Sequence, residues 1–455
     1  MKVVVVGTGY VGLTTGVALA YLGNQVTCLD IDPGKITKLK QNQVPIYEPG
    51  LPELLEISRA NLRFTTSYDE AGIDSSDVVF IAVGTPSLPD GNADLTYVKT
   101  AADALGPRLD HHFTVVVNKS TVPIGSGNWV GTLLREAYAR SKGSQPDGNY
   151  AVASNPEFLR QGSALFDTLY PDRVVIGSED TRAIDTLTNL YRPILNQDFP
   201  PPAFLPRPDG LSAVSVVTCD LASAELIKYA ANSFLALKIS YMNEIAHLTE
   251  KVGADITQVA RGIGLDSRIG PRFLQAGIGW GGSCFGKDTA ALVAISKEYG
   301  MSMPIVQAAR DVNYHQRTWV VDTLLHELKI LKGKTVALLG FAFKPNTDDL
   351  RDAPSLDIAR QLIQRGARVR ATDPVALGNA RQLYPDLGVI YCDQPLDALR
   401  KADAVVLVTE WSEYTRLNWG EIKLTLNNPL ILDGRNFLDR HELERLGYRY
   451  IGVGR

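Results

Sequence analysis

Four consecutive valines, residues 3–6, lead directly into the glycine pattern Gly7, Gly9 and Gly12. A continuous apolar run of this kind is typical of a strand covered on both faces. A helical pattern follows over residues 12–22, and a second strand is predicted over 25–29. A strand, a glycine turn, a helix and another strand in this order predict an α/β domain with a doubly wound, largely parallel sheet.

The glycine pattern also predicts a binding site for a dinucleotide. Gly7 allows the tight turn, Gly9 lets the backbone approach a pyrophosphate, and Gly12 lets the helix pack closely on the strand. Asp30, at the end of the second strand, would accept a hydrogen bond from a ribose 2′-hydroxyl. Because a carboxylate there repels a 2′-phosphate, NAD is favoured over NADP.

Strand and helix patterns alternate twice along the 455 residues, a length that favours two or three domains. Further strands are predicted over 77–83, 113–118, 150–154 and 173–177, with a helix over 95–105. A second series has strands over 334–339, 368–372, 404–409 and 430–432, with a helix over 354–364. The chain is therefore predicted to contain two α/β units joined by helices.

Residues 220–251 lack both proline and glycine, and they predict one long helix. Asp220 is a plausible N-cap and Gly253 a plausible stop. The middle of this helix is apolar around most of its circumference, so two flanking domains or a second subunit must cover it. The proline-rich residues 199–210 just before it predict an exposed loop.

Composition excludes several classes of function. The net charge of −4 and the pI near 5.9 argue against a nucleic-acid-binding protein. No apolar run approaches the ~18 residues of a membrane span. The four cysteines are too scattered for a disulfide framework or a zinc site, so no metal is expected and a reducing, cytoplasmic setting is predicted.

A cysteine in a glycine-rich loop is the second chemical signal. Gly262 to Gly286 is predicted as loop, with Cys284 near the start of a helix over 288–299. A helix N-terminus and the neighbouring Lys287 both favour a thiolate, and Asp288 would lie one turn away. NAD combined with a reactive thiol suggests oxidation of an aldehyde through a thiohemiacetal and a thioester.

Polar residues also gather on the long helix and at the ends of strands. Lys228 and Asn232, one turn apart, could donate to one developing oxyanion, or they could form a solvated stripe. Glu157 could activate water or contact substrate, or it could interact with a helix dipole. Loops 83–86 and 119–123 follow strands at the sheet edge where doubly wound folds bind ligands, although ordinary turns are the alternative.

Taken together, these motifs resemble the UDP-glucose 6-dehydrogenases of the UDP-glucose/GDP-mannose dehydrogenase superfamily. The resemblance covers essentially the whole chain, and its motifs occur in the order found in the family. They comprise residues 7–12, 119–123, 155–162, 225–232, 267–274, 279–288, 341–344 and 433–435.

The resemblance implies that UDP-glucose, two NAD⁺ and water give UDP-glucuronate, a precursor for polysaccharide biosynthesis, and two NADH. Cys284 would be the nucleophile, and Lys228 with Asn232 would stabilise the oxyanion. Asp288 and Thr121 would position and activate water, and Glu157 would assist proton transfer.

The resemblance also implies two Rossmann-like domains joined by the long helix, with homodimerisation through that helix. The boundaries would be 1–212 for NAD binding, 213–312 for the central helical region and 313–455 for UDP-sugar binding. The NAD site would comprise Gly7, Gly9, Tyr10, Val11, Gly12, Asp30, Lys35, Thr85, Ser120, Thr121, Lys287 and Arg351. The sugar nucleotide would contact Glu157, Phe158, Leu159, Arg160, Lys228, Asn232, Arg268, Arg272, Phe273, Leu274, Gly281, Lys344 and Arg435, with Arg268 reaching across from a neighbouring subunit.

Three departures from the family pattern accompany the resemblance, one of them a proline-rich stretch around residues 200–208 that is longer than usual. Gly286 stands where the family often has proline, which predicts a looser loop, and Gln161 replaces a frequent glutamate. The alternative substrates are GDP-mannose and UDP-N-acetylmannosamine. A non-catalytic nucleotide-sugar sensor is the alternative from another class.

Overall fold

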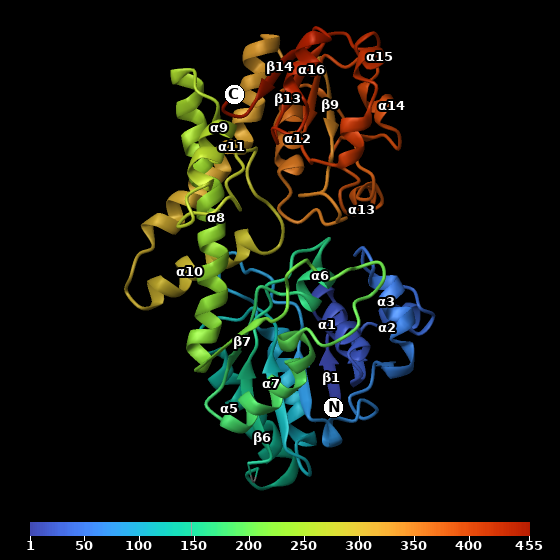
Figure 1. The fold of residues 1–455 in the computed structure, drawn as a ribbon, viewed down its shortest axis with the longest axis vertical. Helices are drawn as coiled ribbons and strands as arrows, with labels where there is room; N and C mark the ends of the chain where they lie inside the picture. The colour runs from blue at the N-terminus through green and yellow to red at the C-terminus, as the bar shows by residue number, and fades with distance from the viewer. Residues whose placement is uncertain (147) are drawn as a thin grey trace. The chain divides into compact units, whose positions relative to one another are not determined.

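The computed structural model describes residues 1–146 and 148–455, which form two compact units, Met1–Ala230 and Ala231–Arg455. Each unit contains one sheet with helices packed on its faces (Figure 1). The α/β class predicted from the alternating patterns is confirmed.

The first unit contains an eight-stranded sheet in the order β3-β2-β1-β4-β5-β6-β7-β8. Its first six strands have the order typical of dinucleotide-binding folds. All neighbouring strands are parallel except β6 and β7, which run antiparallel with Ser154 opposite Gly177, so the sheet is not wholly parallel. The strands are β1 Lys2–Val6, β2 Gln25–Leu29, β3 Leu62–Thr65, β4 Val78–Ile81, β5 Thr114–Asn118, β6 Tyr150–Ser154, β7 Arg173–Gly177 and β8 Ser215–Cys219.

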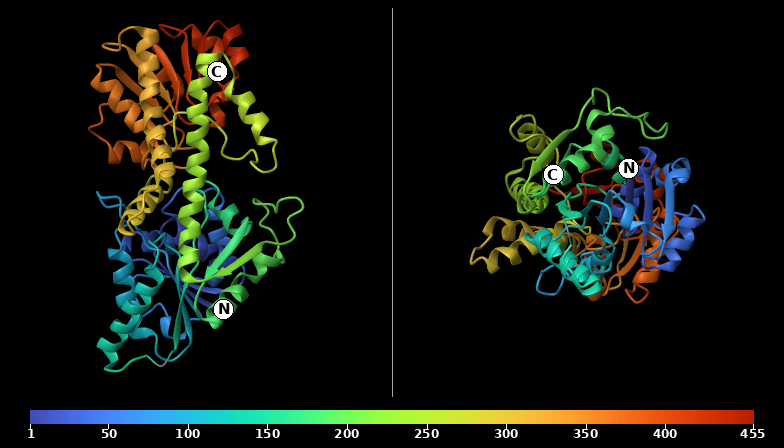
Figure 2. Two further views of the ribbon diagram at one scale, coloured as in Figure 1. Left: turned by 90° about the vertical axis from the view of Figure 1, so that its left-hand side faces the viewer. Right: turned by 90° about the horizontal axis from the view of Figure 1, so that it is seen from below.

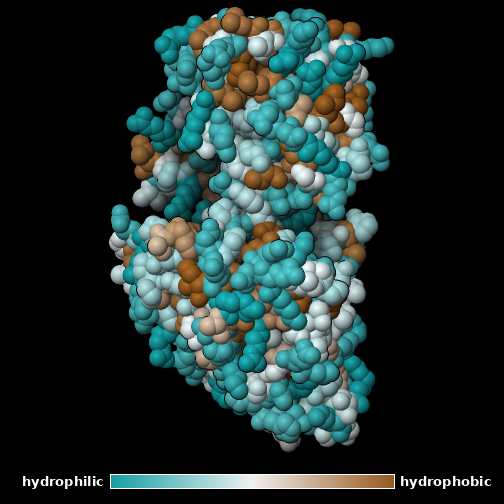
Figure 3. All heavy atoms as spheres, turned by 90° about the vertical axis from the view of Figure 1, so that its right-hand side faces the viewer, coloured by the Kyte–Doolittle hydropathy of each residue, from teal (hydrophilic) through white to brown (hydrophobic). Residues whose placement is uncertain are grey.

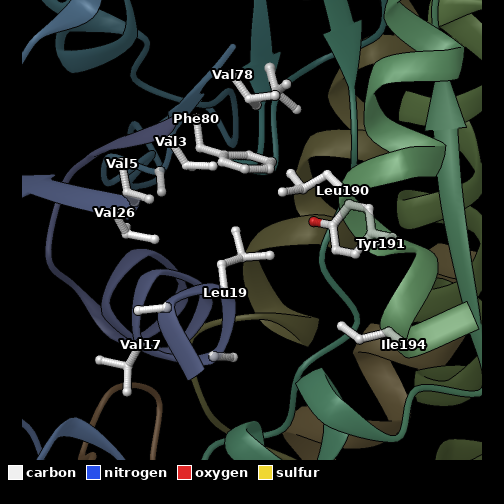
Figure 4. Close-up of a cluster of buried hydrophobic side chains, with 14 of the residues drawn as sticks. Val3, Val5, Val17, Leu19, Val26, Val78, Phe80, Leu190, Tyr191 and Ile194 are labelled. Atoms are coloured by element: carbon white, nitrogen blue, oxygen red, sulfur yellow. The ribbon is translucent and has the colours of Figure 1, made fainter. Parts of the chain in front are cut away.

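Alternate valines of β1 enter two different cores because successive side chains of a strand point to opposite faces. Val3 and Val5 belong to the core that includes α1 and α7, whereas Val4 and Val6 pack with α4 and α5. Figure 4 shows Leu19 of α1 and residues of α7 meeting the first of these faces. The helices are α1 Tyr10–Tyr21, α2 Pro33–Lys40, α3 Leu51–Ile57, α4 Thr96–Leu105, α5 Ser126–Lys142, α6 Ala164–Leu169 and α7 Thr181–Asn196.

The proline-rich segment 199–210 is held to the first unit at several points. Tyr21 donates to the carbonyl of Pro200 at 2.6 Å, and Tyr170 donates to that of Leu205 at 2.9 Å. Arg207 donates to the carbonyl of Phe199, whose ring is buried. The segment is therefore a loop, as predicted, but its buried anchors fix it against the core.

The long predicted helix is α8, Leu221–Val252, which Figure 2 shows as one uninterrupted helix. Asp220 caps it by accepting from the amide of Ser223 at 2.7 Å, and Gly253 follows its end with a φ of +74°. The division between the two units falls within this helix, after Ala230.

The second unit contains a six-stranded, wholly parallel sheet in the order β11-β10-β9-β12-β13-β14. Counted from β9, this is the same order as in the first six strands of the other sheet. The strands are β9 Thr335–Leu339, β10 Arg368–Thr372, β11 Ile390–Tyr391, β12 Ala404–Leu407, β13 Leu430–Asp433 and β14 Arg449–Gly452.

Helices again cover both faces of this second sheet. Val336 and Leu338 pack with residues of α8, α11 and α12, whereas Ala337 and Leu339 pack with α14, α15 and α16. The predicted loop 262–286 is shorter than expected, because α9 extends to Gly264 and α10 begins at Phe285. The helices are α9 Ile256–Gly264, α10 Phe285–Glu298, α11 Pro304–Leu328, α12 Pro354–Gln364, α13 Leu377–Leu383, α14 Pro395–Leu399, α15 Trp419–Lys423 and α16 Arg440–Arg445.

None of the described helices is both long and apolar enough to cross a membrane. On the face drawn in Figure 3, hydrophobic residues form separate patches among hydrophilic ones. Such scattered exposure is normal for folded proteins.

Candidate active site

The glycine turn after β1 has the geometry that a dinucleotide site requires. Gly7 has a φ of +100° and donates to the carbonyl of Leu29 at 2.7 Å. A Cβ at Gly12 would lie 1.9 Å from the carbonyl oxygen of Gly7, so this glycine permits the close packing of α1. A Cβ at Gly9 would meet none of the described atoms within 4 Å, which leaves the backbone open to a ligand.

Asp30 closes this corner of the sheet. Its Oδ2 accepts from the amide and the hydroxyl of Thr8, both at 2.7 Å, and its Oδ1 accepts from the amide of Asp32 at 3.0 Å. Burial opposes ionisation, but these hydrogen bonds and the nearby Lys35 hold the pKa of Asp30 below its usual value. The carboxylate is therefore ionised, and Oδ1 retains a lone pair for a ribose hydroxyl.

The loops after β4 and β5, which the sequence marked separately, are joined by hydrogen bonds. Thr85 donates from Oγ1 to the carbonyl of Thr121 at 2.9 Å. Ser120 donates from Oγ to the carbonyl of Val83 at 2.7 Å. The structure thus brings Thr85, Ser120 and Thr121 together at the edge of the sheet where Gly7 also lies.

Lys228 and Glu157 form a buried ion pair in the first unit. Lys228 Nζ lies 3.1 Å from Glu157 Oε1 and also donates to the main-chain carbonyl of Glu157. The other oxygen of Glu157 accepts from the amide of Leu159 at 2.7 Å. The alternative of a solvated stripe is therefore wrong for Lys228, which is 3% exposed.

A second buried lysine adjoins this pair, and sequence reasoning did not single it out. Lys119 donates to Asn155 Oδ1 at 2.8 Å, and Tyr191 donates to the same oxygen at 2.6 Å. Burial is the main cause that lowers the pKa of Lys119 to about 8, opposed by the charge of Glu157. The sequence signal that could have identified Lys119 as a site residue is its position directly before Ser120 in a predicted ligand-binding loop.

Arg160 and its loop are held by two carboxylates. Arg160 forms an ion pair with Asp167 at 2.6 Å, while half of its side chain remains exposed. Glu48 accepts from the amides of Gly162 and Ala164 at 2.6 and 2.7 Å, which fixes the loop that follows Glu157. Phe158 lies beneath the guanidinium of Arg173.

Cys284 occupies the N-cap position of α10 in the second unit. Asp288 lies one turn further, with its amide donating to the carbonyl of Cys284 at 2.8 Å. Asn232 Nδ2 donates to Asp288 Oδ2 at 2.6 Å, and Lys287 Nζ lies 2.8 Å from Asp288 Oδ1. The thiol is therefore placed at a helix N-terminus, one turn before a residue whose buried carboxylate has two partners.

Residues of helix α11 that were not predicted as site residues hold the loop before Cys284 by hydrogen bonds. Asn313 exchanges hydrogen bonds with both main-chain groups of Trp280, at 2.7 and 3.0 Å. Arg317, which is buried, donates to the same carbonyl at 2.9 Å and forms ion pairs with Asp352 and Asp357. These contacts explain how a glycine-rich loop holds one conformation.

Gly286, the departure from the family pattern, lies in the first turn of α10. Its carbonyl accepts from Arg310 Nη1 at 2.8 Å. A Cβ at this position would approach Asp352 Oδ2 to 2.9 Å. The segment after Cys284 is thus held by α11, and Gly286 makes room for Asp352.

Several predicted substrate contacts are engaged within the second unit. Arg435 donates to the carbonyls of Val408 and Gly279 at 2.8 and 3.0 Å. Leu274 is buried, and Phe273 has a φ of +64°. Two further arginines form ion pairs with nearby aspartates: Arg268 with Asp266 and Arg351 with Asp349. Lys344 lies over the ring of Phe343, and Arg272 directly precedes Phe273 in the sequence. A Cβ on Gly281 would approach the main chain of Asp352 too closely.

Three family models match the chain in succession. They are the NAD binding domain, the central domain and the UDP binding domain of the UDP-glucose/GDP-mannose dehydrogenase family, over residues 1–195, 222–315 and 337–440. Their order agrees with the two sheets and the intervening helices described above.

Full-length relatives agree with this assignment. The chain is 45% identical over its whole length to UDP-glucose 6-dehydrogenase TuaD of Bacillus subtilis, covering 93% of that protein. It is 44% identical to UDP-glucose 6-dehydrogenase of Rhizobium meliloti, with both chains fully covered.

Solved structures resemble the whole chain as well. A UDP-glucose dehydrogenase from Pyrobaculum islandicum is 38% identical, with a TM-score of 0.87 over 100% of this chain and 97% of that one. A UDP-D-ManNAc dehydrogenase from Pyrococcus horikoshii is 25% identical, with a TM-score of 0.84 over 100% and 99%. The family models cover most of the chain, and the two sheets have the fold of these enzymes, so the chain belongs to the UDP-glucose/GDP-mannose dehydrogenase family.

Proposed function

We propose that this protein is an NAD-dependent UDP-glucose 6-dehydrogenase, which oxidises the C6 alcohol of UDP-glucose to the carboxylate of UDP-glucuronate. The observation that carries the proposal is Cys284 at the N-cap of α10, with Asp288 one turn away and held by Asn232. An alcohol-to-aldehyde oxidation needs no such thiol, whereas an aldehyde-to-acid oxidation gains a covalent adduct from it. Full-length relatives with this activity support the choice of substrate.

The corner after β1 fits NAD. Gly9 leaves room for the pyrophosphate, and Asp30 has acceptor capacity for the ribose. When bound, NAD supplies the acceptor for a hydride. Tyr10, Val11, Lys35, Thr85, Ser120, Lys287 and Arg351 complete the set that we assign to this cofactor.

Cys284 takes part in the second oxidation. Its sulfur attacks C6 of the aldehyde, forming a C–S bond and a thiohemiacetal oxyanion, and loss of a hydride then leaves a thioester. Water adds to the thioester carbonyl, and the C–S bond breaks to release the acid and the thiol. The helix N-terminus favours the thiolate both as nucleophile and as leaving group.

The polar residues supply proton transfer and charge stabilisation around this sulfur chemistry. Lys228 and Asn232 stabilise the oxyanion, and Asn232 has a second N–H besides the one donated to Asp288. Asp288 and Thr121 orient the hydrolytic water, and Glu157 transfers its proton. These roles follow from the family resemblance and agree with the pairs that each unit forms.

The second sheet is proposed to bind the UDP moiety, within domains that divide at about residues 212 and 312. Lys344 and Arg435 supply cationic groups for a diphosphate there. Arg268 has a largely exposed side chain, as a residue that reaches toward another subunit requires. Gln161 at the frequent glutamate position leaves Glu157 as the carboxylate of that motif.

A homodimer is proposed through α8. Phe234, Tyr241 and Leu248 recur every seven residues along one face, and they are 62%, 51% and 57% exposed. A second copy would remove this apolar stripe from water. A reducing, cytoplasmic setting is also proposed, because the four cysteines are too scattered in the sequence for a disulfide framework.

One assay tests the function. The purified protein is mixed with NAD⁺ and UDP-glucose, GDP-mannose or UDP-N-acetylmannosamine, and NADH is counted per sugar consumed. Two NADH per UDP-glucose are expected, and a ratio of one would contradict an acid-forming mechanism. Turnover of another sugar would reassign the substrate, and none would indicate a sensor.

The Cys284→Ser variant tests the thiol. Its steady-state rate of UDP-glucuronate formation is expected to fall at least about 10³-fold, while NAD binding is retained. Cys392→Ser is the matched control, because Cys392 lies at the end of β11 and donates weakly to the carbonyl of Ile390. Full activity of the first variant would exclude Cys284 as the nucleophile.

A further inference from the structure

Helix α5 begins without a capping side chain of its own. Its N-cap is Gly125, at a φ of +90°, and the first amides of any helix lack partners within the helix. The loop that enters this helix carries Ser120 and Thr121, so whatever fixes the helix start also fixes the end of this loop.

A carboxylate from a distant part of the sequence supplies the missing cap. Glu225 Oε2 accepts from the amide of Gly125 at 2.6 Å, and its Oε1 accepts from that of Gly127 at 2.8 Å. A Cβ at Gly127 would lie 2.9 Å from Leu221 of α8 and 3.3 Å from Glu225 Oε1. The glycine therefore allows α8 to come close enough for the contact.

The position of Glu225 on α8 links the cap to the proposed chemistry. Glu225 precedes Lys228 by three residues, and side chains with this spacing lie on one face of a helix. Lys228 holds the loop after β6 through Glu157, and Glu225 holds the loop after β5 through Gly125 and Gly127. One turn of α8 therefore holds the two loops of the first unit that carry proposed catalytic residues, Thr121 and Glu157.

An ordinary cap does not require this burial. Asp220 and Asp180 cap α8 and α7 from adjacent positions in the sequence, and both are more exposed. Glu225 is 2% exposed, and burial raises the pKa of its carboxyl to about 7 against the effect of both amides. A carboxylate in this place costs stability, which points to a role beyond helix capping.

We propose that Glu225 is a positioning residue of the oxidation, which holds the Ser120–Thr121 loop in register with Lys228 on α8. This inference rests on the proposed function. We assign Glu225 no contact with substrate or cofactor; it acts through the two amides at the start of α5.

The test compares Glu225→Gln with Asp220→Asn. Glutamine keeps one acceptor oxygen but turns an NH₂ toward the second amide, so the loop loses one of its two attachments. We expect kcat to fall about 10- to 100-fold, with the KM for UDP-glucose within twofold of the wild-type value. Asp220→Asn removes the carboxylate charge at the start of the same helix without touching the loop, and its kcat should be unchanged.

A second variant disturbs the same attachment from the loop side. Gly125→Ala adds a methyl group into open space among the described atoms but strains a backbone at φ +90°. It should lower kcat in the same way, and in both loop variants a peptide covering residues 119–128 should exchange its amide hydrogens faster.

The outcomes separate this inference from the proposed function. If wild-type protein is active and Glu225→Gln retains its kcat, or if Asp220→Asn loses as much, the positioning role is wrong. If wild-type protein turns over no nucleotide sugar, the proposed function fails first. Faster exchange in 119–128 without any loss of kcat would likewise overturn the positioning role.

Discussion

The turn after the first strand has the same backbone geometry in both sheets, but its surroundings differ. In both, the first strand ends in a glycine with positive φ, Gly7 at +100° and Gly340 at +90°. Each glycine donates to the last residue of the second strand, to Leu29 at 2.7 Å and to Thr372 at 2.9 Å. In both, an aspartate follows that second strand and accepts from amides just after the glycine.

The difference lies in what occupies the corner. Asp30 has a lone pair available, and the backbone at Gly9 is open. Asp373 instead accepts from five protein donors, and Phe341, the residue after Gly340, is fully buried. The donors to Asp373 are the amides of Phe341, Ala342, Val375 and Ala376 and the indole of Trp411. One strand order thus supports an open dinucleotide corner in one unit and a filled, structural corner in the other.

The largest expected effect comes from Asp373→Asn. An amide cannot satisfy five donors, so buried N–H groups lose their acceptor, and the free energy of unfolding should fall by about 3–5 kcal/mol. Denaturant titration measures the loss. The KM for NAD should not change under conditions in which the variant is folded, and a change there would mean that the second corner is also a cofactor site.

Gly9→Ala should have a smaller and purely functional effect. Gly9 has a φ of −75°, which alanine adopts freely, so the thermal midpoint should stay within about 2 °C. The added methyl group would occupy the space assigned to the pyrophosphate, and the KM for NAD should rise roughly 30-fold. Gly378→Ala is the matched control, because its surroundings in α13 are equally open within the described structure. Equal kinetics in both variants would remove NAD from the first corner.

The sequence predicts the strands that form these corners better than the contacts that fill them. Strands β1, β2, β6, β7 and β10 were predicted at their observed bounds, because each is a short segment that contains apolar or β-branched residues within a series of alternating strands and helices. Strand β8, with the sequence Ser-Val-Val-Thr-Cys, was missed because it is a short, largely exposed edge strand. The sequence also did not predict that the corner after β9 is filled by protein groups. This depends on a hydrogen bond from the indole of Trp411 to Asp373, which lies 38 residues earlier in the sequence.

In the candidate site, too, local features were predictable from the sequence and long-range contacts were not. Local motifs identified Cys284 and Lys228, because glycine patterns and helical spacing are visible in a sequence. Their partners come from far away, Glu157 lying 71 residues from Lys228 and Asp288 lying 56 residues from Asn232. Asn313 and Arg317 were not predicted, because side chains that donate to the carbonyl of a distant loop leave no local pattern in the sequence.

Asp30→Asn should change cofactor preference at the open corner by about tenfold. The substitution removes the charge that repels a 2′-phosphate and weakens the bond to the ribose. The ratio of kcat/KM for NAD to that for NADP should therefore fall by about this factor, or 1.4 kcal/mol. The same ratio measured for Asp373→Asn is the control, and a parallel fall in both would contradict the division of roles.

The comparison extends to the fifth strand of each order, β5 and β13. The loop after β13 is held by Asp433 on its own strand, through the amides of Phe437 and Leu438, both at 2.8 Å. The loop after β5 is held by Glu225 from α8. Burial raises the pKa of both acids. The loop after β13, which carries Arg435, is thus held by a carboxylate of its own strand, whereas the loop after β5 is held by a carboxylate of another element.

The smallest expected effect is a pH dependence of stability that originates from Glu225. Its folded pKa of about 7 lies above the ordinary value of 4.5, so the folded state holds the proton more tightly. The resulting stability is fully present below pH 4.5 and is lost as the pH rises through 7. Between pH 6 and pH 8 the loss should amount to about 1 kcal/mol. Glu225→Gln cannot titrate, so the difference between the wild-type and variant free energies of unfolding should change by this amount across that interval. A constant difference would show that burial does not raise the pKa of Glu225, and the likeness to Asp433, whose pKa burial also raises, would disappear.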